Sequence, residues 1–82
     1  APDRRLLVRS FYRVLGEMRA DDRLVFTLRH VEGLTLADTA EACGLSETTA
    51  KRRLKRARER FYKRASRDFV LATAMEELRI DE

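Results

Sequence analysis

The chain has 82 residues, a formal net charge of +4 and a single cysteine, Cys43. This length predicts one small domain, residues 1–82, and a lone cysteine excludes an intrachain disulfide, which fits a reducing cytoplasm. No apolar run approaches the ~20 residues that span a bilayer, and the first residues lack the apolar stretch of a signal peptide. The chain begins at Ala1 rather than Met, so the sequence leaves open that it is a piece of a longer protein.

The positive charge is concentrated in one segment. Residues 51–67 hold ten of the eighteen Lys and Arg residues and one acid, Glu59, so this segment carries +9 and the remainder carries −5. A concentrated basic element on a mildly acidic body indicates a polyanion partner. A basic amphipathic helix can also lie on an anionic membrane, but its apolar stripe here (Ala50, Leu54, Ala57 and Phe61) is too narrow, so no membrane partner is expected.

β-branched alternation is absent, so the chain is predicted to be all-α, with four to five helices. Asp3 is suited to cap a first helix that ends near Met18, with Leu7, Phe11, Val14, Leu15 and Met18 on one face. A second helix is expected over about Asp22 to Val31, capped by Asp21 or Asp22. Its buried stripe is expected to be Leu24, Val25, Leu28 and Val31. Gly33 suits the left-handed position that ends many helices.

A helix-turn-helix is predicted over about residues 35–65. Thr35 caps a short helix from about Leu36 to Cys43, Gly44 supplies the positive φ of the turn, and Ser46 caps a helix from Glu47 onward. Ala40 and Ala50 are small enough for a close helix crossing, which Leu36, Leu45 and Leu54 would fix. A last helix over about 68–80 follows a break at Ser66 or Asp68, with Leu71, Ala74, Met75 and Leu78 on one face.

The outward side chains of the basic helix have the chemistry of a DNA-recognition helix. The residues in its first turns are expected to reach base edges: Glu47, Thr48, Lys51 and Arg52. Lys51 and Arg52 can donate to guanine, and Glu47 can accept from cytosine. Flanking groups are expected to meet phosphates: Thr35, Arg53, Lys55, Arg56 and Arg60.

A solvated helix face is the plain alternative for such a basic run. Like charges four residues apart destabilise a helix by a few tenths of a kcal/mol per pair, and Arg52/Arg56 and Arg56/Arg60 are such pairs without evident compensating acids. A sequence that tolerates this repulsion is more consistent with nucleic-acid binding than with a bare surface.

From about Met18 to Arg64 the sequence resembles region 4 of bacterial sigma factors, especially the extracytoplasmic-function group. The resemblance is carried by V-F-T-L-R, E-G-L-T, A-D-x-A-E-x-x-G-L-S and T-x-K-R-R-L-x-R-A-R. It implies binding to the −35 element of double-stranded promoter DNA, docking on the flap of the RNA polymerase β subunit, and capture by an anti-sigma factor. By position, Glu47, Thr48, Lys51 and Arg52 match the family's base-reading sites.

Several positions depart from that family. Thr39 stands where Ile or Val is common and Ala50 where Val is common, so the crossing of the two helices is expected to be lightly packed, with Leu71 and Met75 of the tail as a support. No region 2 is present, so the chain alone is not expected to initiate transcription.

No other chemistry is indicated. His30 has no Cys or Asp partner at metal-ligand spacing, and Cys43 is expected to be a small buried residue. There is no nucleophile motif or phosphate-binding glycine loop, so neither an enzyme nor a cofactor is expected.

Two alternatives stay open at this point. One is a response-regulator-type effector domain, dimeric through the last helix, and the other is an interaction module held by an acidic protein such as an anti-sigma factor. A weak homodimer through the last helix is a further expectation.

Overall fold

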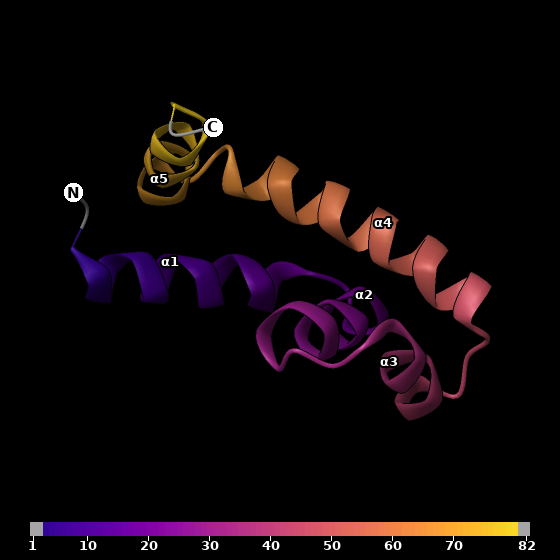
Figure 1. Cartoon of the computed structure of the whole chain (residues 1–82). Coiled ribbons are helices and arrows are strands. Elements are labelled where there is room, and N and C mark those ends of the chain that lie inside the picture. The colour runs from indigo at the N-terminus through magenta and orange to yellow at the C-terminus, as the bar shows by residue number, and fades with distance from the viewer. Residues whose placement is uncertain (1–2, 81–82) are drawn as a thin grey trace. The chain divides into compact units, whose positions relative to one another are not determined.

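The computed structural model describes residues 3–80, with side chains described through Glu76, and this part of the chain is helical without strands (Figure 1). Five α-helices and one π-helical turn follow one another: α1 (Arg4–Glu17), α2 (Ala20–Phe26), η1 (Thr27–Val31), α3 (Leu36–Cys43), α4 (Glu47–Ala65) and α5 (Phe69–Ile80). The predicted all-α fold is therefore confirmed. Among the helices of residues 3–80, none combines the length and apolarity that a membrane crossing needs.

The chain forms two compact units. One joins Ala1–Glu17 to Phe61–Glu82, and the other is Met18–Arg60. Helix α4 contributes residues to both units, 47–60 to the second and 61–65 to the first. The unit Met18–Arg60 contains α2, η1, α3 and most of α4, so it holds the whole predicted helix-turn-helix up to Arg60.

The helix-turn-helix begins and ends where its capping residues predict. Thr35 Oγ1 accepts the Asp38 N–H at 3.0 Å, and Ser46 Oγ accepts the Thr49 N–H at 3.1 Å, so both helices have a side-chain cap. Gly44 between them has φ +67°, a left-handed conformation that glycine adopts without steric strain because it has no Cβ. The N–H groups of Gly44 and Leu45 donate to the carbonyls of Glu41 and Ala40, at 3.1 and 2.8 Å, and so close the end of α3.

The buried face of α4 is also as predicted. Its inward stripe is almost fully buried and consists mostly of small side chains: Ala50, Leu54, Ala57, Phe61 and Ala65. Thr39 and Ala40 of α3 are buried as well. Thr39 Oγ1 finds no hydrogen-bond partner among the described residues, and such a buried hydroxyl costs about 1–3 kcal/mol. The crossing therefore carries a buried hydroxyl oxygen without a partner among the described residues, and its light packing stays a prediction.

The second helix differs from its prediction. It begins at Ala20, after Arg19 in an extended conformation, so neither Asp21 nor Asp22 is its N-cap. It also does not continue as an α-helix to Val31, because a π-helical turn takes over at Thr27 and the Glu32 N–H reaches back to the Thr27 carbonyl at 2.9 Å. Gly33 then takes φ +79°, as predicted for the residue that ends the element.

The buried stripe predicted for this helix is wrong at Leu24, which is 50% exposed. Val25 and Phe26 are buried, and the third residue on their face is Asp22, at 1% exposure. The sequence predicts Asp22 as a possible cap of this helix and not as a buried residue. The carboxylate is buried here because two arginines of α4 pair with it.

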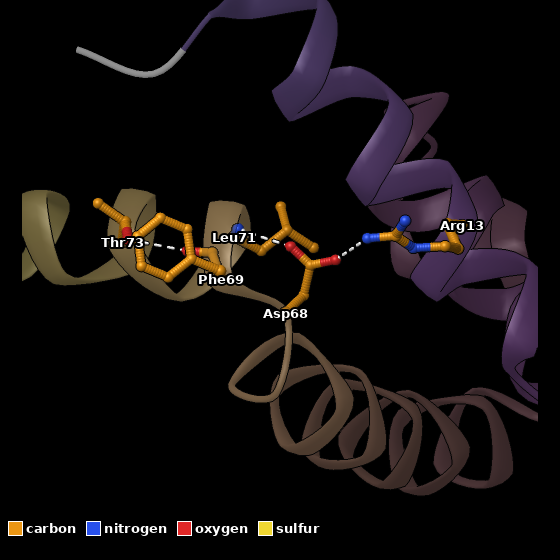
Figure 2. Close-up of polar contacts among 5 residues, drawn as sticks. All are labelled: Arg13, Asp68, Phe69, Leu71 and Thr73. Carbon is orange, nitrogen blue, oxygen red and sulfur yellow. Dashed lines mark hydrogen bonds and ion pairs between the residues drawn. The ribbon is translucent and has the colours of Figure 1, made fainter.

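The break before α5 is confirmed and is made by Asp68. One carboxylate oxygen accepts the Leu71 N–H at 3.0 Å, and the other pairs with the guanidinium of Arg13 on α1 (Figure 2). The bond from Leu71, followed by that from Arg13, lowers the pKa of Asp68 despite the opposing effect of burial. Leu71 is buried and Met75 half-buried, whereas the side chain of Leu78 lies outside the described residues. Since α5 packs on α1 in their own unit, its support of the α3–α4 crossing stays a prediction.

Candidate DNA-binding surface

The four predicted base-reading residues lie together in the first turns of α4. Glu47, Thr48, Lys51 and Arg52 are all exposed. Ala50 and Leu54 on the opposite side of these turns are buried, and at 100° per residue this anchoring turns the four side chains outward. The structure therefore presents a carboxylate, a hydroxyl, an ammonium and a guanidinium on one helix face.

The predicted phosphate-binding cations of α4 lie within that face and beside it. Lys55 is exposed and continues the outward face, whereas Arg53 is half-buried beside it. A small cavity of about 130 Å³ on this flank is lined by Thr49, Arg52, Arg53 and Arg56. Three guanidinium groups around one hollow give this flank a strongly positive potential, which favours an anion.

Arg56 and Arg60 have an internal partner that sequence reasoning missed. Arg56 Nη2 lies 3.2 Å from Asp22 Oδ1, and Arg60 Nη1 lies 2.6 Å from Asp22 Oδ2. Burial raises the pKa of Asp22, but the hydrogen bonds and charges of Arg60 and Arg56 outweigh it, so the pKa lies below its usual value. The expectation that these arginines lack a compensating acid is therefore wrong, since α2 supplies Asp22.

A signal for this pairing is present in the sequence, although it is weak. Asp22 shares a helix face with Val25 and Phe26, at spacings of three and four residues. An acid at such a position is either exposed at the edge of the stripe or buried with a partner. The i,i+4 arginines of α4 are the natural partner, but their pairing depends on tertiary structure.

Thr35 is exposed at the start of α3, where its hydroxyl oxygen caps the helix. The N-terminus of a helix carries partial positive charge and points its first N–H groups outward, so this end of α3 can face a phosphate. The capping role predicted for Thr35 is thus confirmed, and its phosphate-binding role stays a prediction.

Two residues that the sequence analysis does not count as site candidates are His30 and Cys43. His30 is exposed, with its ring centroid 5.0 Å from that of Phe26. Partial burial, and then the charges of Arg58 and Arg29, lower the pKa of His30. Cys43 is a free thiol that is half-buried rather than buried. Within the part of the chain that the structure describes, no group of His, Cys, Asp and Glu side chains could hold a metal ion.

Comparison with known families shows which family model the chain matches. Residues 9–61 match the model described as Sigma-70, region 4. No curated protein and no solved structure matches the chain. The matched segment runs from α1 to Phe61 and covers more than half of the chain, with the complete turn between α3 and α4 inside it. The chain therefore belongs to the sigma-70 region 4 family, whose domain is a non-enzymatic DNA-binding module that binds the −35 element of promoters in transcription initiation.

Proposed function

We propose that α4 reads the −35 element through Glu47, Thr48, Lys51 and Arg52. The observation that carries this proposal is the placement of all four side chains outward in the first turns of a helix whose other side is buried. Those turns are the part of a recognition helix that enters the major groove. Lys51 and Arg52 supply donors for guanine O6 and N7, and Glu47 supplies an acceptor for cytosine N4.

The cations beside this face hold the DNA backbone. Arg53, Lys55, Arg56 and Arg60 contact phosphates along α4, and Thr35 at the start of α3 contacts another. Phosphate contacts fix the register of the helix but carry no direct sequence information. Substitutions in the two sets should therefore have different effects. A change in the base-reading set alters the sequence preference, whereas a change in the phosphate-binding set weakens binding to all sequences alike.

Replacing Arg52 by alanine is expected to relax the preference at one base pair by about 1–3 kcal/mol, the usual discrimination of a bidentate contact. The matched control is Lys55→Ala, which removes an exposed cation from the same helix and should weaken binding to all duplexes alike. Fluorescence anisotropy with a set of duplexes that each carry one changed base pair measures both effects. An Arg52→Ala protein with an unchanged preference at every position would show that Arg52 does not read a base.

Sigma region 4 also binds RNA polymerase, and we propose that the flap of the β subunit docks on an apolar cavity in the other unit. This cavity of about 500 Å³ lies among α1, the end of α4 and α5, and the lining includes Leu7, Phe11, Phe61, Leu71 and Met75. An exposed apolar hollow of this kind is typical of a protein-binding site. An anti-sigma factor that covered the same cavity would compete with polymerase, and a weak homodimer through α5 would also close it.

Two exposed aliphatic residues of α1 provide a matched test of this docking site. Val8 is 47% exposed and lines the cavity, whereas Leu6 is 48% exposed and does not. Val8→Glu should weaken binding to the isolated flap by at least about tenfold, because the interface would have to desolvate a carboxylate. Leu6→Glu should change the affinity for the flap by less than about twofold, because a substitution at an exposed position outside the cavity has little effect. Equal effects in surface plasmon resonance would place the flap elsewhere.

A further inference from the structure

The carboxylate of Asp22 lies beneath two of the cations that face DNA. Its side chain is 1% exposed, whereas the side chains of Arg56 and Arg60 are 50% and 42% exposed. Each carboxylate oxygen accepts a hydrogen bond from one guanidinium group: Oδ1 from Arg56 and Oδ2 from Arg60. The three groups therefore form a layered cluster, with the negative charge inside and the two positive charges toward solvent.

This cluster has one positive charge in excess rather than two. Breaking either pair would leave a buried carboxylate short of a partner, which is strongly unfavourable. The two guanidinium groups are thus expected to remain on Asp22 when a phosphate approaches from the solvent side. Their side chains are already ordered in the free protein, so less conformational freedom is lost on binding.

We propose that Asp22 is a positioning residue for DNA binding, which fixes Arg56 and Arg60 on the flank of α4 and neutralises one of their two charges. Asp22 thereby limits the sequence-independent attraction of the basic helix for DNA. The remaining affinity depends more strongly on Glu47, Thr48, Lys51 and Arg52. This inference rests on the proposed role of the α4 cations in phosphate binding.

The test is the salt dependence of binding to a duplex of unrelated sequence, compared between the unchanged chain and Asp22→Asn. The amide is nearly isosteric but uncharged, so one additional cation is left for phosphates. The slope of log affinity against log salt should become steeper by about 0.9. Over a tenfold salt range such a change in slope corresponds to about eightfold in affinity.

Asp21→Asn is the matched control, because it changes the net charge equally at the neighbouring position, where the side chain is exposed. Its slope should stay close to that of the unchanged chain. An unchanged slope in Asp22→Asn, or an equal change in both variants, would overturn the role of Asp22. An Arg52→Ala protein with unchanged base preference, by contrast, would overturn only the reading of bases by Arg52. Absence of salt-dependent binding by the unchanged chain would overturn phosphate binding by α4 itself.

A measurement on the unchanged chain covers the case in which Asp22→Asn does not fold. The carbon-13 signal of the Asp22 carboxyl group is followed by NMR while the unrelated duplex is added. A signal that keeps the position of the paired carboxylate supports the proposal, since the arginines then bind phosphate without leaving Asp22. A shift to the position of an unpaired carboxylate would overturn it.

Discussion

The affinity of this chain for a duplex with its −35 element is expected to fall roughly 10²- to 10³-fold between 50 and 200 mM salt. Lys51, Arg52, Arg53 and Lys55 each bring a cation to the DNA, and the cluster of Arg56, Arg60 and Asp22 brings one more in net terms. Each cation that displaces a condensed counterion from the DNA, in the groove or at the backbone, contributes about −0.9 to the slope of log affinity against log salt, so five cations give about −4.5. Anisotropy titrations at four or five salt concentrations measure this slope.

The contribution of α4 to that slope can be separated from the charge of the whole chain. Lys55→Gln should reduce the slope by about 0.9, whereas Arg4→Gln, which removes an exposed cation of α1, should leave it unchanged. A wild-type slope shallower than about −2 would contradict the displacement of counterions by five cations of α4. The basic helix would then be better explained by an acidic protein partner, which is the interaction module considered from the sequence.

Elements with a local signal were predictable from the sequence to within a residue or two. Thr35, Gly44 and Ser46 define the turn by their own side chains or by the lack of one, and each has the predicted role. The same holds for Asp68, because its cap of α5 involves a residue only three positions away. Capping and positive φ are properties of a few neighbouring residues, so the sequence contains the information directly.

The segment from Ala20 to Val31 shows where such reasoning fails. A regular α-helical period was assumed, but the helix changes to a π-helical turn at Thr27, and Leu24 is exposed while Asp22 is buried. The burial of Asp22 depends on α4, since Arg56 and Arg60 pair with its carboxylate. For the same reason the exposure of the predicted base-reading residues followed from their helix position, whereas the internal partner of Arg56 and Arg60 did not.

Replacing Leu54 by alanine is expected to lower the free energy of unfolding by about 2–5 kcal/mol, the usual cost of emptying a leucine site in a core. Leu54 is 3% exposed and is the one large side chain that α4 buries within the unit Met18–Arg60, since the other buried apolar residues of this part of the helix are Ala50 and Ala57. Alanine neighbours cannot fill the cavity by changing rotamer. The loss of unfolding free energy should therefore lie toward the upper end of this range. Urea denaturation measures it.

Leu24→Ala is the matched control for this prediction, because it removes the same atoms from a side chain that is 50% exposed. Its effect should stay below about 1 kcal/mol, as for most surface substitutions. A similar loss in both proteins would mean that Leu24 is buried in solution and that the face of α2 is the one expected from simple periodicity. A domain of this size has a total stability of roughly 4–12 kcal/mol, so Leu54→Ala should also abolish DNA binding at elevated temperature. The outward face of α4 depends on this inward anchor, and the two properties should be lost in the same thermal transition.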